Sequence, residues 1–267
     1  MKNPILRLDP EGIFREDGFW GLARATFSLY DQPLPTDPWV GYAGEYAPGL
    51  HWMGKTYFNF AEMEQYPNFI GFTAEKVSTK FEADFAYLKT VMSELKNVDI
   101  EDVVISGTPI GGYDITKLVG QIVGCRTIKL EKKVLKVGVK GQRDITELIM
   151  ERYDIDSGTI VWGGEDVINN RASTKEQYKL YTELGAVFAG VISVLDRSTD
   201  QDPWFTIPET NHRIYTTSWI SEKMDQFHQD NPLAAKAIAA DNVFWKPKRK
   251  WNILKGIMQR AAQTAIT

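Results

Sequence analysis

The sequence predicts an α/β fold with a central parallel sheet flanked by helices. Short apolar runs typical of buried strands recur at residues 103–105, 159–162 and 185–197. Segments with helical spacing or helix-end signals follow or precede them, at 72–97, 112–123 and 174–184. Glycine-rich or polar loops come directly after the strands, where α/β proteins place binding residues. This alternation of strand, loop and helix is the basis of the prediction.

Length and composition suit one large domain, or one domain with an added subdomain. The chain has 267 residues, of which 43% are hydrophobic, and its eight tryptophans support a substantial core. Its net charge of −4 argues against broad electrostatic binding of nucleic acid or membrane. We expect a cytoplasmic protein, since Cys125 has no partner for an internal disulfide and neither a signal peptide nor a membrane span is evident. The three histidines lack metal-ligand spacing, so no zinc site is predicted.

Residues 1–70 are predicted to form an N-terminal hood, a segment of short strands and turns with one helix near residues 19–29. The segment is rich in aromatic residues, glycine and proline, and lacks clean periodicity. Near its end, Lys55 precedes Tyr57 and Phe58, whose rings could stack on a planar base. The alternative is an ordinary half-buried strand.

A core of residues 71–198 is predicted next, and it contains a candidate phosphate loop. After a helix over 72–97 and a strand over 99–106, the chain reads Ser-Gly-Thr-Pro-Ile-Gly-Gly at residues 106–112. A glycine-rich loop between a strand and a helix is a candidate phosphate site, here with Thr108, Gly111 and Gly112. The alternative is a plain turn between strand and helix.

Basic residues gather in the following segment, residues 129–143. Alternating Leu135, Val137 and Val139 predict a hairpin arm, with Lys132 and Lys133 among its basic residues. The arm is either a solvated hairpin or a mobile cationic flap suited to a pyrophosphate leaving group. A short helix is predicted over residues 144–153.

Two adjacent carboxylates, Glu165 and Asp166, end the next predicted strand. A small polar loop, Asn169, Asn170, Arg171, Ala172 and Ser173, then leads into a helix over 174–184. A helix N-terminus suits a phosphate, whereas two carboxylates need ribose hydroxyls or a magnesium ion shared with pyrophosphate. The stretch therefore predicts a site for a sugar phosphate.

Residues 199–267 are predicted to form a C-terminal helical extension. Asn231-Pro232 marks a helix start, and a basic run flanked by tryptophans, residues 245–251, precedes a last amphipathic helix. The basic run could contact nucleic acid, but a solvated turn is the favoured interpretation given the acidic total charge.

In their order along residues 50–198, these motifs resemble those of the type I phosphoribosyltransferase family, in the Glu-Asp form of orotate phosphoribosyltransferase. The resemblance implies that Glu165 and Asp166 hold the ribose diol and residues 169–173 the 5′-phosphate. It implies a pyrophosphate loop at residues 106–112 and a base-side role for Lys55, Tyr57, Phe58 and Lys175. It further assigns catalysis to Lys133, with Lys132 second, and to Asp166.

The resemblance also implies a magnesium ion, held mainly through pyrophosphate and water rather than by protein ligands, and a homodimer whose arm closes across subunits. Four features depart from the family pattern, one of them Trp52 in the place of a base-contacting lysine. The loop at 169–173 has lost its glycines, Leu135 stands in place of a histidine, and Lys175 replaces an arginine. Arg171 could clamp the phosphate or fill its site.

The leading hypothesis is an enzyme that transfers a phosphoribosyl group from phosphoribosyl pyrophosphate to a nitrogenous base, orotate by default, and releases pyrophosphate. A second is a non-catalytic regulatory protein that binds a nucleotide or phosphoribosyl pyrophosphate on the same fold. The missing glycines favour this second hypothesis. A third is a structural subunit of an assembly, with the C-terminal region as its interface.

Overall fold

A computed structural model describes residues 8–47, 50–109, 111–137, 145–169, 171–198, 200–223, 225–245 and 247–264. The chain divides into two compact units. The first unit draws on Met1–Tyr66, Lys136–Ile145 and Met224–Thr267, and the second on Pro67–Leu135 and Thr146–Lys223. The predicted site residues Glu165 and Asp166 belong to the second unit.

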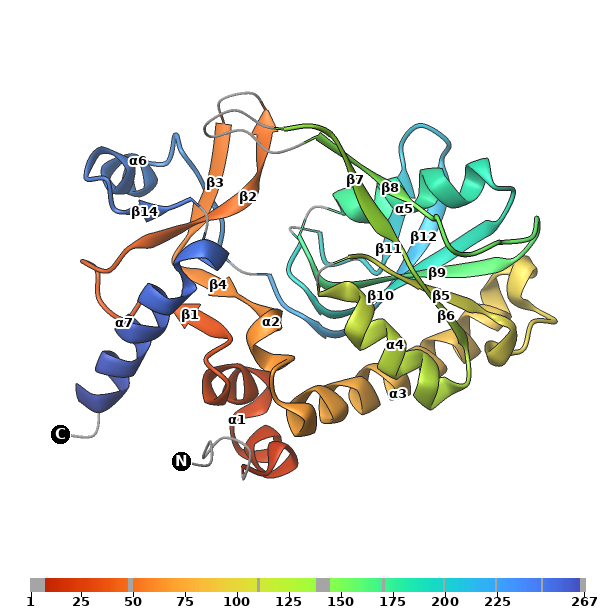
Figure 1. Ribbon diagram of the computed structural model, residues 1–267, viewed down its shortest axis with the longest axis horizontal. Coiled ribbons are helices and arrows are strands. Elements are labelled where there is room, and N and C mark those ends of the chain that lie inside the picture. Colours follow the sequence, from red (N-terminus) through yellow and green to blue (C-terminus); the bar gives the residue numbers. More distant parts are fainter. Residues whose placement is uncertain are drawn as a thin grey trace. The chain divides into compact units, whose positions relative to one another are not determined.

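The second unit is built on a six-stranded sheet in the order β11-β12-β10-β9-β5-β6 (Figure 1). All neighbouring pairs in this sheet are parallel except β11 and β12. The helices and strands of the unit follow in chain order: α3 (Pro67–Val91), η2 (Ser93–Leu95), η3 (Ile100–Asp102), β5 (Val104–Gly107), α4 (Gly112–Val123), β6 (Arg126–Lys129), β7 (Glu131–Lys136), β8 (Ile145–Ile149), β9 (Ile160–Ile168), α5 (Ala172–Glu183), β10 (Val187–Asp196), β11 (Trp204–Ile207) and β12 (His212–Ser221). The predicted α/β fold class, with a mostly parallel central sheet and flanking helices, is confirmed.

Helices cover both faces of this sheet, and adjacent glycines in β9 show how closely they pack. A β-carbon on Gly164 would lie 2.0 Å from Thr116 Oγ1 of α4, and one on Gly163 would lie 2.7 Å from Gln177 Oε1 of α5. Because successive strand residues face opposite sides, α4 and α5 lie on opposite faces of the sheet. Figure 1 shows α3 on the same side as α4.

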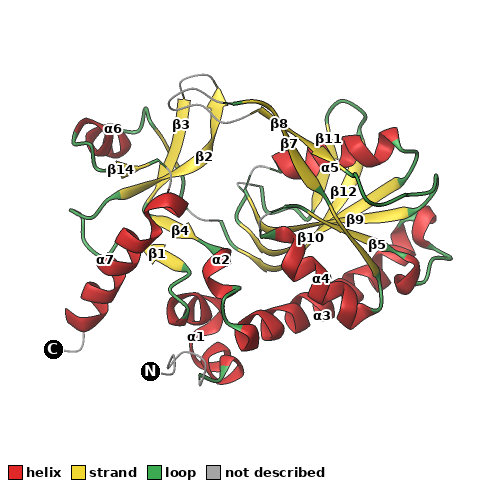
Figure 2. Cartoon of the chain, viewed as in Figure 1, coloured by secondary structure: helices red, strands yellow, loops and turns green. Residues whose placement is uncertain are grey.

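The sequence prediction was wrong for residues 144–153. Residues 145–149 form β8, which pairs with β7 as a two-stranded ribbon (Figure 2). Ile145, Leu148 and Ile149 have spacing that fits a helix, but Leu148 alone is fully buried, in the core cluster that includes Val161 and Phe188. Strand pairing and burial of one residue therefore override the local pattern.

The predicted boundary at residue 198 also differs from the structure. Strands β11 and β12, which follow it, belong to the central sheet, and β12 lies in parallel register beside β10. The alternating apolar pattern of β12 is weak because polar Thr216, Thr217 and Ser218 are buried within it. The helical part of the predicted extension begins only at Pro232.

The first unit joins the two ends of the chain. Its four-stranded sheet has the order β13-β3-β2-β14. The two outer strands come from the C-terminal segment, and they pair with the hood strands β3 and β2. Its elements are α1 (Pro10–Ala25), β1 (Leu29–Asp31), β2 (Trp39–Ala47), β3 (Leu50–Gly54), β4 (Thr56–Phe58), α2 (Phe60–Met63), β13 (Phe227–His228), α6 (Pro232–Ala239), β14 (Val243–Phe244), η4 (Pro247–Lys250) and α7 (Trp251–Thr264). Within the described ranges, none of the helices has the length and apolar character needed to cross a bilayer.

Helix α7 closes a core in this unit. Trp251, Leu254 and Ile257 are buried together with Tyr30 and Val40 from the N-terminal segment. Lys255 of the same helix donates a hydrogen bond to Glu62 of α2. The hood of this unit is thus completed by residues from the end of the chain.

We expect Leu254→Ala to destabilise the first unit by about 2–5 kcal/mol, because Leu254 is fully buried and its truncation leaves a cavity. Hydrogen exchange of β1, β4 and α7 measures this loss. Ile253→Ala is the matched control, since Ile253 is 50% exposed on the same helix. Equal exchange in the two variants would contradict the packing of α7 described above.

Candidate functional site

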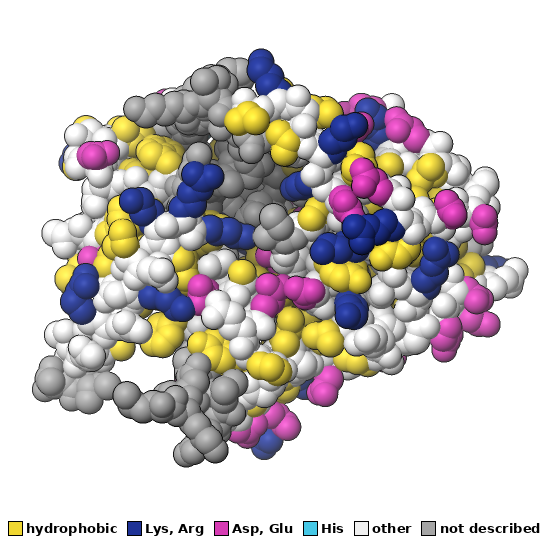
Figure 3. Space-filling model, viewed as in Figure 1, with side chains coloured by type: hydrophobic (Ala, Val, Ile, Leu, Met, Phe, Trp, Pro, Cys, Tyr) yellow, Lys and Arg dark blue, Asp and Glu magenta, His cyan; other side chains and the backbone are white. Residues whose placement is uncertain are grey.

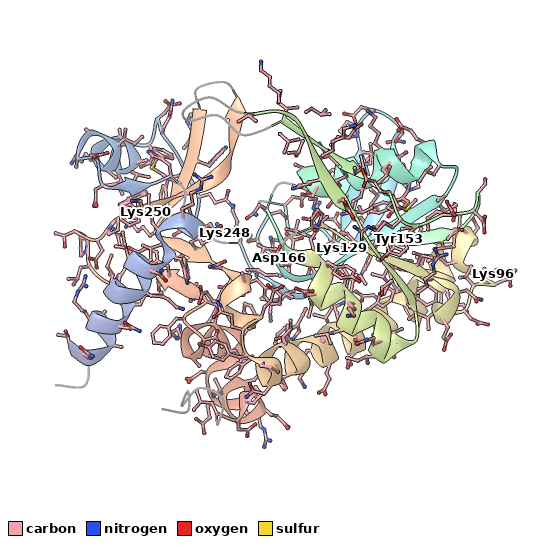
Figure 4. All side chains as sticks on the ribbon, in the orientation of Figure 1. Lys96, Lys129, Tyr153, Asp166, Lys248 and Lys250 are labelled. Atoms are coloured by element: carbon pink, nitrogen blue, oxygen red, sulfur yellow. The ribbon has the colours of Figure 1, made fainter. Side chains whose placement is uncertain are left out.

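The carboxyl ends of the parallel strands bring several chemistry-bearing residues to one edge of the sheet. Thr108 follows β5, Asp166 lies near the end of β9 and Lys129 ends β6. Figure 4 labels Asp166 on β9 and Lys129 on β6. This edge is where open α/β sheets bind their ligands.

The glycine-rich loop lies directly against the acidic pair. Gly111 has φ +109°, and a β-carbon there would lie 2.4 Å from Asp166 Oδ2. A β-carbon on Gly112 would lie 2.3 Å from Thr108 Oγ1 and 2.6 Å from the Gly164 carbonyl oxygen. Glycine is required at both positions, since residue 111 needs a positive φ and residue 112 needs close approach. The Asp166 carboxylate thus lies directly beside the glycine loop.

Thr108 fastens this loop to β9. Its amide and its hydroxyl both donate to the Gly164 carbonyl oxygen, at 3.0 and 3.1 Å. Gly111 is the N-cap of α4 and supplies no side-chain cap. The first turn of α4 therefore starts beside Asp166 without a capping side chain from its own N-cap residue.

Glu165 is buried and differs in character from its neighbour. Its side chain is 7% exposed, and Oε1 accepts a hydrogen bond from Thr174 Oγ1 at 3.0 Å. Burial raises the pKa of Glu165 to about 8, while the Thr174 hydrogen bond opposes this and the Asp166 charge adds to it. At neutral pH this carboxyl is protonated in the folded chain, so it joins α5 to β9 as a neutral group.

Asp166 is only half-buried, and its Oδ1 accepts the Val167 amide at 2.9 Å. Of the predicted diol-binding pair, Asp166 is the accessible carboxylate. The strand continues past the two carboxylates, which were predicted to end it, to Ile168. The alternation of strand side chains separates the two carboxylates onto different faces.

Arg171, the predicted phosphate-loop residue, points into the protein. It is 4% exposed, and its Nη2 donates to Asp196 Oδ2 at 3.3 Å, to the Asp200 carbonyl at 3.3 Å and to the Asp202 carbonyl at 3.1 Å. Its φ of 58° is left-handed, the conformation that glycine adopts most readily. The sequence left open whether Arg171 clamps the phosphate or fills its site, and the structure pairs its guanidinium with Asp196 instead.

The other residues of this loop lie at the surface of the α5 start. Asn169 and Ala172 are exposed and Ser173 is half-buried, whereas Asn170 lies outside the described residues. Lys175 is exposed in the first turn of α5, with its Nζ 5.5 Å from the centre of the Phe205 ring. The N-cap side chain of α5 makes no capping hydrogen bond.

The two predicted catalytic lysines lie on β7. Lys132 and Lys133 are exposed, and as neighbours in a strand they face opposite sides. The charge of Lys132 lowers the pKa of Glu165, which places Lys132 within electrostatic range of the acidic pair. Lys129 adds a third positive charge, with its Nζ 5.2 Å from the centre of the Tyr113 ring in the first turn of α4.

Three of the four predicted base-side residues, Lys55, Tyr57 and Phe58, belong to the first unit, whereas Lys175 belongs to the second. Lys55 is exposed, with its Nζ 5.5 Å from the centre of the Trp39 ring. Phe58 is 4% exposed and packs edge-on against Phe19, so it belongs to the core of that unit. Tyr57 is half-buried against Trp251 and is the more accessible of the two rings.

Within the basic run at residues 245–251, residues 247–250 form the short helix η4 and Trp251 begins α7. Lys248, Arg249 and Lys250 are exposed, whereas Trp251 is buried in the core of the first unit. Lys246 lies outside the described residues. On the face that Figure 3 shows, dark blue basic side chains are interspersed with magenta acidic ones.

Three residues of the site were missed by the sequence analysis. Thr174 holds Glu165, Asp196 holds Arg171, and Lys129 lies beside the start of α4. A signal existed for two of them, because Lys129 and Asp196 end strands that neighbour β5 and β9 in the parallel sheet. Thr174 had none, since its role depends on the burial of Glu165.

Metal binding by protein groups alone is not supported in the described part of the chain. No three His, Cys, Asp or Glu side chains among the described residues lie close enough to hold a metal ion. The donor set at this edge is one accessible carboxylate, Asp166. It fits a magnesium ion that is bound chiefly by substrate phosphates and water, the usual arrangement for this ion.

Two curated relatives align with about half of the chain. The orotate phosphoribosyltransferase of Chlorobaculum parvum is 29% identical over 144 residues, which are 54% of this chain and 61% of the relative. That of Chlorobium phaeobacteroides is 30% identical over 151 residues, 56% of this chain and 63% of the relative. The chain thus spans less than two thirds of the length of these relatives.

Among solved structures, the orotate phosphoribosyltransferase from Aeropyrum pernix has a TM-score of 0.47 with this chain at 9% identity. The match covers 75% of this chain and 91% of that one. No family model matches the chain.

The predicted resemblance is confirmed: with its parallel sheet, glycine loop and acidic pair at the carboxyl edge, this chain resembles the type I phosphoribosyltransferases. The curated relatives reported above are orotate phosphoribosyltransferases. That name agrees with the Glu-Asp form of the motif at residues 165–166.

Proposed function

We propose that the protein is a phosphoribosyltransferase that moves the phosphoribosyl group of phosphoribosyl pyrophosphate to a nitrogenous base. One observation supports this most directly: the left-handed Gly111 of the glycine loop lies against Asp166 Oδ2, beside the start of α4. This arrangement offers a carboxylate for a ribose diol next to backbone amides for a pyrophosphate. The sequence relatives reported above are named orotate phosphoribosyltransferases.

In the proposed reaction the bond from ribose C1 to the pyrophosphate oxygen breaks, and a bond from C1 to a ring nitrogen of the base forms. Asp166 would accept hydrogen bonds from the ribose hydroxyls and favour the positive charge that develops on the ring. The glycine loop, which Thr108 fastens to β9, would donate the amides of Gly111 and Gly112 to the departing pyrophosphate. The start of α5 would bind the 5′-phosphate, so catalysis comes from positioning and electrostatics.

Lys132, Lys133 and Lys129 would neutralise negative charge on the pyrophosphate as it leaves. A magnesium ion bound with the substrate would supply further neutralisation of the phosphates. Glu165 would act indirectly, by holding the first turn of α5 through Thr174. Its buried, protonated carboxyl leaves the ribose diol to Asp166.

Orotate is the proposed base, because the relatives reported above are named orotate phosphoribosyltransferases. Tyr57 and Lys55 are the proposed base-side residues, and Lys175 remains a proposed contact in the first turn of α5. We also propose a homodimer, with the β7–β8 arm as the element that closes across subunits. Exposed apolar side chains support this role for the arm, namely Val134, Leu135, Val137 and Ile145.

A second candidate function is a protein that binds phosphoribosyl pyrophosphate or a nucleotide without catalysis. The inward, ion-paired Arg171 favours it, because the loop does not supply the glycine amides that approach a phosphate closely. Both candidates require phosphoribosyl pyrophosphate to bind. Only the first requires pyrophosphate to be released.

A screen of bases separates these two functions. The full chain is incubated with phosphoribosyl pyrophosphate, magnesium and one base at a time, including orotate, uracil, adenine and hypoxanthine. Release of pyrophosphate that depends on a base supports the transferase. Binding without release for every base supports the second candidate, and the absence of binding contradicts both.

We expect Lys132→Ala to weaken pyrophosphate binding about tenfold, on the order of 1.4 kcal/mol. The reason is that Lys132 lies within electrostatic range of the acidic pair, whereas Lys133 faces the other side of β7. Lys133→Ala is therefore the matched control variant, and we expect it to lose less pyrophosphate affinity than Lys132→Ala. Calorimetric titration with magnesium pyrophosphate measures both, and a larger loss in Lys133→Ala would restore the assignment that the resemblance implies.

A further inference from the structure

Arg171 occupies a backbone conformation that an arginine adopts only under constraint. It is the N-cap of α5, with φ 58° and ψ 23°. Such a residue persists in this region when its surroundings hold it there. The contacts of its side chain therefore indicate what the residue does.

Those contacts lead to the loop between β10 and β11. Nη2 of Arg171 reaches the Asp196 carboxylate and the carbonyl oxygens of Asp200 and Asp202. The guanidinium carbon lies 5.0 Å from the centre of the Phe205 ring. One side chain thus joins the start of α5 to both ends of the loop.

The loop has its own bracing. Asp196 Oδ1 accepts the Ser198 amide at 2.8 Å, and Ser198 Oγ donates to the Asp200 carbonyl at 2.7 Å. Gln201 Nε2 donates to the Ser198 carbonyl at 2.6 Å, and Ser221 Oγ donates to Gln201 Oε1 at 2.6 Å. These hydrogen bonds join the described residues of the loop to one another, and Arg171 links them to α5.

Charge makes this link important for an anionic ligand. Asp196 is 3% exposed, and its carboxylate oxygen Oδ2 lies 3.3 Å from Nη2 of Arg171, the N-cap residue of α5. A buried carboxylate without a counter-ion would repel a phosphate at that helix start. Arg171 supplies the counter-ion.

We propose that Arg171 is a positioning residue that ties the β10–β11 loop to the start of α5 and neutralises Asp196, so that the 5′-phosphate end of the site is preassembled. This inference rests on the proposed function. At position 171, where the family pattern has glycine, this chain has an arginine whose buried ion pair with Asp196 holds the β10–β11 loop. Arg171 itself is not a phosphate ligand.

The test uses the full chain and three variants, Arg171→Lys, Arg171→Ala and the double variant Arg171→Ala with Asp196→Asn. Arg213→Lys is the matched control, because Arg213 is exposed on β12 and packs over Trp204. Ribose 5-phosphate and magnesium pyrophosphate are titrated separately by calorimetry. Hydrogen exchange over residues 197–205 is measured without ligand.

For Arg171→Lys we expect ribose 5-phosphate affinity to fall about tenfold, with pyrophosphate affinity unchanged, because the compact ammonium of lysine lacks the planar, extended fork of a guanidinium. Exchange over residues 197–205 becomes faster. Arg171→Ala loses more affinity, and the added Asp196→Asn change recovers part of it because the repelling charge is gone. A merely structural role would weaken both ligands alike and would show no recovery.

Wild-type affinity and wild-type exchange in Arg171→Lys would overturn the inference. Equal loss of both ligands, or no recovery in the double variant, would overturn it as well. If the wild-type chain binds neither ribose 5-phosphate nor phosphoribosyl pyrophosphate, the proposed function fails. Hydrogen exchange then still decides whether Arg171 holds the loop.

Discussion

Replacing Asp166 by Asn is expected to weaken the binding of phosphoribosyl pyrophosphate by about a hundredfold, on the order of 2.7 kcal/mol. Asp166 is the accessible carboxylate of the pair, and it lies against Gly111 at the start of the glycine loop. A charged carboxylate accepts hydrogen bonds from a diol about twice as strongly as a neutral amide does. The loss of charge also removes the group that favours positive charge on the ribose.

The stability of the Asp166→Asn variant should stay within about 0.5–1 kcal/mol of the wild type, as for most half-exposed substitutions. Calorimetric titration gives the affinity, and urea unfolding gives the stability. Asp156→Asn is the control, because Asp156 is exposed and lies at the opposite end of β9. Wild-type affinity in the Asp166 variant would remove this residue from the site.

Glu165→Gln is expected to stabilise the protein, and the gain should grow with pH. The pKa of Glu165 is about 8 in the folded chain, against 4.5 for a solvent-exposed glutamate carboxyl such as that of the unfolded chain, mainly because of burial. Between these values the unfolded chain loses its proton while the folded chain keeps it. The wild type therefore loses about 1.4 kcal/mol of stability per pH unit across this window, to an upper bound of roughly 5 kcal/mol.

Glutamine carries no ionisable proton and still presents an oxygen to Thr174. We therefore expect the two proteins to have similar stability near pH 4.5, and the variant to be the more stable one at pH 8. Above pH 8 the difference should be constant. The sign follows from the raised pKa, since the folded state disfavours the charged form.

Urea unfolding of both proteins at several pH values between 4.5 and 9 checks this expectation. Glu183→Gln is the control, because Glu183 is exposed at the end of α5 and its pair with Lys179 is a surface contact. Parallel stability curves for wild type and Glu165→Gln would mean that Glu165 ionises freely. Its place as a neutral link between β9 and α5 would then be wrong.

The central sheet and the glycine loop could be predicted from the sequence, because the patterns that indicate them lie within short segments and do not depend on residues far along the chain. The apolar runs of β5, β9 and β10 and the two glycines after β5 are complete within short segments. The β8 segment was predicted wrongly, since its spacing fits a helix and only its pairing with β7 makes it a strand. The first unit was missed for a similar reason, because β14 pairs with β2 across 200 residues of chain.

The site was predicted at the level of motifs, and its internal contacts were not. The adjacency of Glu165 and Asp166 suggested two equivalent carboxylates, but strand alternation and burial give them different environments. The partner of Arg171 could not be found locally, since Asp196 is 25 residues away along the chain. Such contacts depend on the assembled sheet.

The most direct measurement is a quenched reaction of the wild-type chain with phosphoribosyl pyrophosphate, magnesium and orotate, in which nucleotide and pyrophosphate are quantified together. We expect the two products to form in equal amounts, and neither to form in the Asp166→Asn variant above background. If another base instead gives equal amounts of nucleotide and pyrophosphate, the protein is still a phosphoribosyltransferase, and that base takes the place of orotate as its substrate. Tight binding of phosphoribosyl pyrophosphate with no nucleotide from any base would contradict phosphoribosyl transfer and leave the binding function in its place.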